Sequence, residues 1–216
     1  MRNKKAILLI SILMLAAISI YLWRNQAEPK VSSLTKKVDQ TKGAYVSTDF
    51  NTNTFSTKQE AALLKNLRLC DSTIQWSEDE NRPSCTPNFF RVFPLKKGLD
   101  INQGCMVLLK AGVNGFPVRR FVIYEKEGEQ LIQANGFIGY PIEFRPKANS
   151  YDDVVIRFFE RYEGEKYFYN CLFTWKQNRY QFVRCEQIND ANIKPEKQAD
   201  VSAEILQILN EKQLVF

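Results

Sequence analysis

The clearest pattern in the chain is a series of alternating apolar and polar positions in its second half. Segments rich in aromatic and β-branched residues lie at 154–162, 166–175 and 180–186. The dipeptides Glu163-Gly164 and Gln177-Asn178 separate them. Alternation broken by two-residue turn signals predicts antiparallel strands joined by tight hairpins. We therefore expect a three-strand meander between residues 154 and 186.

Shorter strand-like segments precede this meander, and helical patterns flank the whole set. The segments lie at 89–95, 105–110, 118–126 and 130–134, with a turn at Glu127-Gly128. Before them, Thr57 and Glu60 have capping-box spacing and predict a short helix that ends near Cys70. After them, a final helix is predicted from Asp200, with one apolar face formed by Val201, Ile205, Ile208 and Leu209. This order predicts an α+β domain, a mainly antiparallel β-sheet (meander) with a short N-terminal helix and a C-terminal helix packed on it.

The first residues form an uninterrupted apolar run. No charged residue occurs between Ala6 and Trp23, and at about 1.5 Å per residue a helix of this length is roughly 27 Å long, enough to cross the hydrocarbon core of a bilayer. We therefore predict a signal anchor or transmembrane helix at 1–27, a flexible linker at 28–55 and an extracytoplasmic domain at 56–216. The membrane contacts are expected from Ile7, Leu8, Leu9, Leu13, Tyr21 and Trp23.

The charges around the run predict its orientation. Arg2, Lys4 and Lys5 precede it, and such a cluster stays in the cytoplasm, which places the rest of the chain outside. We expect a single-pass protein of a bacterial inner membrane with its C-terminal domain in the periplasm. The alternative is a soluble periplasmic protein released by cleavage at Ala17-Ile18-Ser19.

Charge and composition narrow the possible functions. The formal net charge of +6 falls to +2 for residues 31–216, because five basic residues and one acidic residue lie in the first thirty positions. We therefore expect no basic surface that binds the phosphates of a nucleic-acid backbone, and no nucleic-acid partner. The chain has no histidine, which excludes Ser-His-Asp and Cys-His hydrolases and most catalytic zinc sites. No Gly-rich phosphate loop or metal motif occurs, so we expect no cofactor.

Five cysteines follow the apolar run. Two pairs are close in sequence and predict local disulfides, Cys70 with Cys85 and Cys171 with Cys185, while Cys105 lies in an apolar segment and is expected to be a buried thiol. The turn at 177–178 places Cys171 opposite Arg184 and not opposite Cys185. A local bulge is needed before the second pair can form a bridge.

Aromatic side chains follow one face of the predicted strand at 166–175. In this register Tyr180 lies opposite Trp175 and Phe182 opposite Phe173. The phenylalanines suit the core face of the sheet, whereas tyrosine and tryptophan also dominate binding hot spots. A protein partner is therefore expected to contact this ladder and the acidic loop before Pro83, at Tyr167, Tyr169, Trp175, Tyr180, Trp76, Glu78, Asp79 and Glu80.

Carboxylates near the meander offer one enzymatic alternative. Asp152 and Asp153 precede a strand, and Glu160, Glu163 and Glu165 surround the next turn. A glycosidase needs two carboxylates about 5 to 10 Å apart across a cleft, whereas neighbouring turn acids are usually solvated. We expect no catalytic residue and no metal ligand, and the protein is interpreted as a non-enzyme.

The stretch from Ser150-Tyr151-Asp152-Asp153 through Phe173, Trp175, Tyr180 and Val183 resembles the meander of small exported proteins of Gram-negative bacteria. These proteins include periplasmic inhibitors and immunity proteins, which plug the site of a toxin or hydrolase. The resemblance implies a non-catalytic binding protein of this kind, by analogy of fold. A membrane-tethered envelope assembly or maintenance factor is the alternative.

Overall fold

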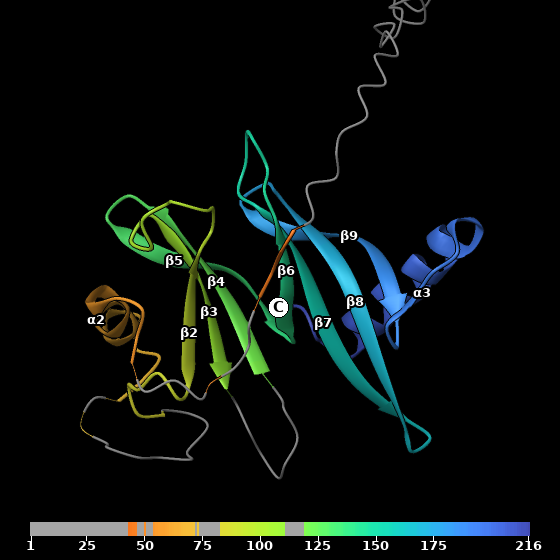
Figure 1. Ribbon diagram of the computed structural model, residues 1–216, viewed down its shortest axis with the longest axis horizontal. Coiled ribbons are helices and arrows are strands. Elements are labelled where there is room, and N and C mark those ends of the chain that lie inside the picture. Colours follow the sequence, from red (N-terminus) through yellow and green to blue (C-terminus); the bar gives the residue numbers. More distant parts are fainter. Residues whose placement is uncertain (1–42, 47–49, 51–53, 72, 74–82, 111–118) are drawn as a thin grey trace, which may run out of the picture. The chain divides into compact units, whose positions relative to one another are not determined.

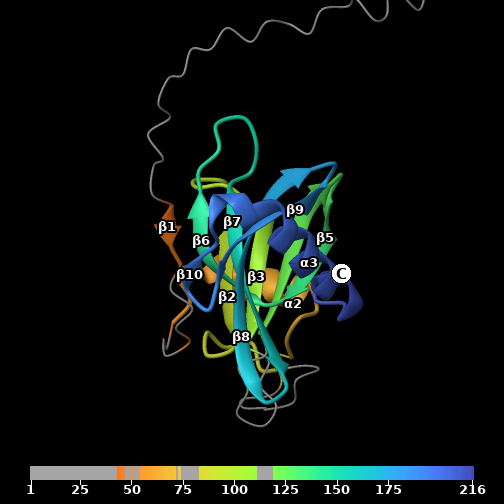
Figure 2. The same ribbon diagram turned by 90° about the vertical axis from the view of Figure 1, so that its right-hand side faces the viewer.

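The computed structural model describes residues 43–46, 50, 54–71, 73, 83–110 and 119–216, which all belong to one compact unit, Thr41–Phe216. The elements within these residues are, in chain order, β1 (Ala44–Tyr45), α2 (Lys58–Asn66), β2 (Phe90–Pro94), β3 (Gly104–Lys110), β4 (Arg119–Glu127), β5 (Gln130–Ile138), β6 (Tyr140–Arg145), β7 (Asp153–Tyr162), β8 (Glu165–Lys176), β9 (Arg179–Ile188), β10 (Ala191–Asn192), the 3-10 turn η1 (Pro195–Lys197) and α3 (Gln198–Glu211). Figures 1 and 2 show their arrangement.

The strands form two antiparallel sheets. One has four strands in the order β2-β3-β4-β5, and the other has six in the order β1-β6-β7-β8-β9-β10. Neighbours in both sheets are mostly consecutive in the chain, so the fold is a meander, as the turn signals predict. The prediction of a mainly antiparallel β domain with a C-terminal helix is confirmed. The division into two sheets was not predicted.

Gly139 is the one residue between β5 and β6, where the chain passes from the first sheet into the second. A Cβ atom at this position would lie 2.7 Å from the carbonyl oxygen of Arg157 and 3.1 Å from Cγ2 of Ile156. Real Cβ atoms do not approach backbone atoms this closely. Glycine therefore lets β5 and β6 follow one another directly while β6 packs against β7.

The two sheets share one hydrophobic core. Phe137 of β5 is fully buried, and its ring centroid lies 6.1 Å from Phe121 in its own sheet and 4.9 Å from Phe173 in the other. Edge-to-face rings at such distances attract one another beyond the effect of their burial. The ladder of Phe residues expected on the inner face of the meander is therefore part of a core between the sheets, as predicted.

A second apolar cluster lies on the other face of the four-stranded sheet, where α2 covers it. Leu63 and Leu64 of the helix pack there with Val107 and Val122 of the strands. The helix begins at the capping box expected from the sequence, in which the Thr57 amide donates to Glu60 Oε1 at 3.1 Å. Figure 1 shows α2 on the side of the four-stranded sheet that faces away from the six-stranded one. Both faces of this sheet are therefore covered.

Helix α3 packs beside β9, and the last residues of the chain pair with the free edge of β5. Ile205 and Leu209 of α3 are buried in the shared core, on the face predicted from the sequence. The Ile138 amide donates to the Leu214 carbonyl at 2.9 Å, and the Phe216 amide donates to the Gly136 carbonyl at 2.9 Å, so residues 214–216 satisfy part of the free edge of β5. The helix begins at Gln198, two residues before the N-cap predicted at Asp200.

The start of the folded unit differs from the prediction. Residues 28–55 were expected to form a linker, yet Ala44–Tyr45 pair with β6, and Val46 and Phe50 are buried. These few apolar residues lie among many polar ones, so local composition resembles that of a tether. The described part of that range belongs to the domain, because β1 pairs with the edge of β6 and because Val46 and Phe50 are buried.

Candidate functional site

The tyrosines and the tryptophan predicted as one binding surface are separated in the structure. Tyr169 and Tyr180 are buried in the core, so they cannot be contact residues in this folded state. Tyr167 and Trp175 are half-buried and lie toward opposite ends of β8. Side chains on one face of a strand form a continuous exposed surface only where no other element packs on that face. Here the second sheet and α3 cover its middle.

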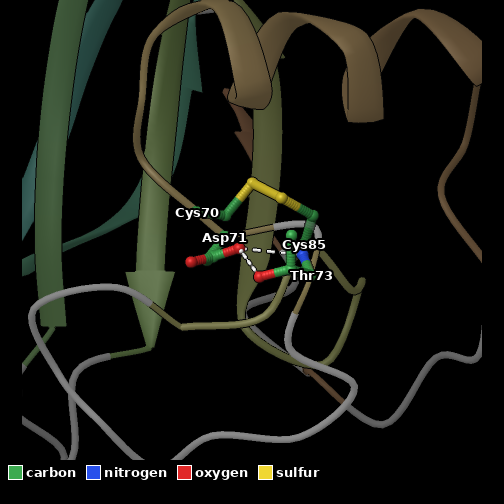
Figure 3. Close-up of a disulfide and its surroundings, with 4 residues drawn as sticks. All are labelled: Cys70, Asp71, Thr73 and Cys85. Atoms are coloured by element: carbon green, nitrogen blue, oxygen red, sulfur yellow. Dashed lines mark hydrogen bonds between the residues drawn. A yellow bond between two sulfur atoms is a disulfide. The ribbon is translucent and has the colours of Figure 1, made fainter.

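The predicted acidic loop residues Trp76, Glu78, Asp79 and Glu80 lie outside the described residues. The ends of the segment that carries them are joined, because Cys70 and Cys85 form the expected disulfide, with Cα atoms 5.0 Å apart. Figure 3 shows this bridge next to Asp71, which accepts hydrogen bonds from the amide and the hydroxyl of Thr73. The Asp71 amide also donates to the Pro83 carbonyl at 3.0 Å.

The β7–β8 hairpin projects beyond the other strands of its sheet. The pairing of β6 with β7 ends at Arg157, and the pairing of β9 with β8 ends at Tyr169, whereas β7 and β8 stay paired as far as Tyr162 and Glu165. The outer part of the hairpin therefore has only two strands. Figure 1 shows it extending beyond the neighbouring strands of its sheet.

An isolated two-stranded hairpin is marginally stable in water, so this one needs support at its base. The support comes from Glu160, whose buried carboxylate accepts a hydrogen bond from the Tyr169 hydroxyl at 2.8 Å and forms an ion pair with Lys212. On the opposite face, the rings of Phe159 and Phe168 lie 5.3 Å apart. The ion pair connects the base of the hairpin to Lys212, which follows α3.

The tip of the hairpin is compact and presents an aromatic side chain. Glu163 and Gly164 have φ values of 50° and 87°, as a tight two-residue hairpin turn requires. Tyr162, which precedes the turn, is 58% exposed and has the largest exposed fraction among the large hydrophobic residues described. Glu163, Glu165 and Lys166 are exposed beside it. The tip therefore combines an accessible tyrosine with charged neighbours on a supported strand pair.

A second surface lies near Trp175, at the other end of β8. The Trp175 ring packs against Tyr151 at 4.9 Å, and the Tyr151 hydroxyl donates to Glu125 at 3.1 Å. Glu125 lines an open hollow of about 340 Å³ together with Asn178 and Ile132, which is 45% exposed. A hollow of about 530 Å³ lies on the other side of the β4–β5 hairpin, next to the end of α2, with lining residues that include Leu67, Arg68, Lys126 and Glu129. Neither hollow brings together groups that suggest a reaction.

Two of the carboxylates considered for catalysis, Asp152 and Asp153, hold loops or strands in place. Asp152 is buried and accepts hydrogen bonds from the Lys97 amide at 3.1 Å and the Lys147 amide at 3.3 Å, which ties the β2–β3 and β6–β7 connections together. Asp153 accepts a hydrogen bond from Thr174 at 2.5 Å and pairs with Lys147 at 3.0 Å. Each carboxylate already has partners that position the surrounding backbone or strand.

The outer face of the six-stranded sheet carries a network of charged groups. Arg145 of β6 donates to both carboxylate oxygens of Glu186 on β9, at 2.8 and 2.7 Å, and Arg184 donates to Glu186 at 2.6 Å. Val155 of β7 and Leu172 of β8 lie side by side between β6 and β9. Both are buried, although they lie on this outer face. The bridge from Arg145 to Glu186 spans these two strands and shields the apolar residues beneath it.

Replacing Glu186 by Gln should lower the free energy of unfolding by about 1 to 2 kcal/mol near neutral pH, because its charge-assisted hydrogen bonds weaken. Burial raises the pKa of Glu186, but hydrogen bonds and charge from Arg145 and Arg184 outweigh it and hold this pKa below its ordinary value of 4.5. Such a carboxylate stabilises the fold fully above its unfolded pKa, and the stabilisation is lost as the pH falls through the folded pKa. Urea unfolding at several pH values should show the two proteins converging below about pH 4.5, the ordinary value of this pKa. A difference that is independent of pH would contradict this account.

The three other cysteines are free and buried. Cys105 lies on the α2 side of the four-stranded sheet, as a buried thiol was expected to do, and burial raises its pKa to about 12. At this value the thiol is protonated near neutral pH and is not a nucleophile. Cys171 and Cys185 were predicted to be bridged, and the structure has them as free thiols on neighbouring strands.

Within the described part of the chain, no three acidic or cysteine side chains are placed to hold a metal ion. No helix of the described residues combines the length and apolar character that crossing a bilayer requires, and the segment predicted to do so, Ala6–Trp23, lies outside them. Comparisons with protein-family models, with curated proteins and with solved structures found no match for this chain.

Proposed function

We propose that this chain is a non-catalytic binding protein held on the periplasmic side of a bacterial inner membrane, and that its partner is a protein. The observation that carries the proposal is the β7–β8 hairpin, which projects from the sheet, is supported at its base by Glu160, and presents Tyr162 at its tip. The anchoring helix is the apolar run from Ala6 to Trp23.

The physical advantage of this hairpin is that much of its ordering is complete before binding. A flexible loop loses conformational freedom when it meets a partner, and this loss reduces affinity. A tight turn on paired strands, with Glu160 tied to Tyr169 and Lys212, loses much less. Tyrosine adds a large, stiff contact surface with a hydroxyl that can hydrogen bond, which is why it is common in binding hot spots.

Among protein partners, we favour an envelope-acting toxin or hydrolase that the chain neutralises. Partner sites of this kind are concave, and a narrow two-stranded projection can enter a concave site where a flat sheet face cannot. The tip residues Tyr162, Glu163 and Glu165 would then occupy the site, with the carboxylates meeting basic groups of the partner. This interpretation agrees with the resemblance of the meander to periplasmic inhibitors and immunity proteins.

Replacing Tyr162 by alanine should weaken capture of the partner from envelope extracts at least tenfold, because a central aromatic contact is lost. The free energy of unfolding should change by less than about 0.5 kcal/mol, since the side chain is exposed. Quantitative pull-down with the full-length chain measures the first value, and urea unfolding measures the second.

Val183→Ala is the matched control for this experiment. Val183 is 41% exposed and lies on β9, away from the hairpin tip, so its removal should leave capture unchanged. Tyr162→Phe separates the contribution of the ring from that of the hydroxyl. Equal capture by the wild-type protein and the Tyr162→Ala variant would show that the hairpin tip is not the contact.

A membrane-tethered assembly or maintenance factor is the second candidate, and the apolar run from Ala6 to Trp23 favours it. Such a factor works only where it is anchored, whereas an inhibitor needs only to reach its target. Replacing residues 1–28 by a cleavable export signal distinguishes the two. Retained protection against the target supports the inhibitor, and loss of function with normal levels of exported protein supports the assembly factor.

A further inference from the structure

Two buried thiols lie opposite each other in the six-stranded sheet. Cys171 of β8 is the register partner of Cys185 of β9, and neither side chain is exposed. The hairpin turn alone does not produce this pairing, since Trp175 lies opposite Tyr180 and Phe173 opposite Phe182, a register that would place Cys171 opposite Arg184. A register shift between Leu172 and Phe173 moves the pairing by one position and so places Cys171 opposite Cys185, and a second shift follows between Asn170 and Cys171. This is the bulge that a bridge between these cysteines requires.

The backbone contacts of Cys185 show that the two cysteines form a non-hydrogen-bonded pair of the antiparallel ladder. Its amide donates to the Ser202 hydroxyl at 3.1 Å, and its carbonyl accepts a hydrogen bond from the Gln198 side chain. Both groups therefore point toward α3 and away from β8. Opposed residues that do not exchange backbone hydrogen bonds have Cα atoms about 4.5 Å apart, with their side chains close together. This separation lies within the range of about 4.4 to 6.8 Å that disulfides span.

We propose that Cys171 and Cys185 are a site of oxidative modification, at which a cross-strand disulfide forms when the chain folds in an oxidising compartment. The bridge links β8 to β9 at the level of the shared core, next to the first turn of α3. No rearrangement of the strands is needed, because the register shifts already align the two residues. The inference rests on this geometry and does not depend on the proposed function.

The chemistry is thiol–disulfide exchange with a small-molecule disulfide such as oxidised glutathione. The thiolate of one cysteine attacks one sulfur of the oxidant, which forms a mixed disulfide and releases one thiolate. The other cysteine then loses its proton and attacks the protein sulfur of this mixed disulfide, and the second thiolate leaves. Two protein S–H groups become one S–S bond, while the oxidant is reduced to two thiols that take up both protons.

The two thiols influence each other in the folded domain. A hydrogen bond with the Cys171 side chain lowers the pKa of Cys185, whereas burial raises the pKa of Cys171. Both shifts belong to the closed sheet, in which the two side chains contact each other. Because both are inaccessible in the folded domain, the oxidant reaches them while the sheet assembles or opens.

Peptide mapping tests the proposal on the wild-type chain. The full-length protein is refolded in a glutathione redox buffer, alkylated under denaturing conditions and digested with trypsin. Cleavage after lysine and arginine, except before proline, places Cys171 in peptide 167–176 and Cys185 in peptide 185–197, so their bridge joins two separate peptides. Cys70 and Cys85 fall in a single peptide, 69–91, because trypsin does not cleave between Arg82 and Pro83.

This digest contains its own references. Peptide 69–91 with an internal bridge shows that the buffer is oxidising, and alkylated Cys105 in peptide 98–110 shows that buried thiols were reached. We expect most of the chain to contain the linked pair 167–176 and 185–197, which reduction separates. If both of these peptides are alkylated in a sample whose peptide 69–91 is bridged, the proposal is wrong.

A second measurement follows the effect on stability. In a Cys70→Ala/Cys85→Ala background, a reductant should lower the midpoint of thermal unfolding by about 5 °C or more, because a bridge across a loop of this size restricts the unfolded chain. Adding Cys171→Ala to that background should abolish the response. A response that survives this substitution would assign the effect to another group.

Discussion

Replacing Phe137 by alanine should lower the free energy of unfolding by about 3 to 5 kcal/mol, the usual cost of removing a buried aromatic side chain. Phe137 is fully buried and belongs to β5, yet its ring contacts Phe158 and Phe173 of the other sheet as well as Phe121 of its own. The substitution removes these contacts at the place where the two sheets meet. The remaining rings come from rigid strands and can fill little of the cavity.

Urea unfolding followed by tryptophan fluorescence measures this loss. Ile132→Ala is the matched control, because Ile132 lies on the same strand and is 45% exposed. Its replacement should change the free energy of unfolding by less than about 0.5 kcal/mol. If both variants lose similar amounts, the shared core does not depend on Phe137 in the way described.

Replacing Asn135 by alanine should lower the free energy of unfolding by about 2 to 4 kcal/mol, because it leaves two buried backbone groups without a partner. The Asn135 side-chain amide donates to the Tyr180 carbonyl at 3.1 Å, and its oxygen accepts from the Tyr180 amide at 3.2 Å. The side chain of Asn135 thus takes the place of a paired backbone and joins β5 to β9, which belong to different sheets. The Tyr180 hydroxyl extends the connection, since it donates to the Asp152 carbonyl at 2.7 Å.

Two variants show whether the amide itself is responsible. Gln133→Ala, two residues earlier on β5 and exposed, should change the free energy of unfolding by less than about 0.5 kcal/mol. Asn135→Asp keeps an acceptor but removes the donor and adds a buried charge, so it should be at least as destabilising as alanine. Hydrogen exchange at the Tyr180 amide should become faster in Asn135→Ala, which removes the acceptor of this amide. Unchanged protection there would contradict the assigned bonds.

Local signals predicted most individual elements. Alternation and turn residues located the strands of the meander, and the tight turns at Glu163-Gly164 and Gln177-Asn178 occur with the positive φ values that such turns need. The opposition of Trp175 to Tyr180 and of Phe173 to Phe182 also followed from the turn. A two-residue hairpin sets the register of the residues next to it, so these pairs depend only on neighbouring sequence.

The candidate site was less accessible from the sequence. Tyr167, Tyr169, Trp175 and Tyr180 were grouped because they share one face of a predicted hairpin, and that face is covered in its middle. The exposed tip residue Tyr162 was not singled out, although it stands directly before a turn signal. An aromatic residue in a strand is exposed where the neighbouring strands do not extend to its level, and buried where they do. The lengths of those neighbours are set by parts of the chain far from the residue.

By itself, the sequence determined the class of fold, the place of most strands and helices, the close pairing of Cys70 with Cys85, and the lack of imidazole chemistry. These follow from residue type, period and spacing, which act over a few neighbouring positions. Only the tertiary structure decided that the meander divides into two sheets at Gly139, that Asn135 joins their edges, and that register shifts bring Cys171 opposite Cys185. Each of these depends on contacts between residues far apart in the chain, where packing and hydrogen bonding outweigh local preference.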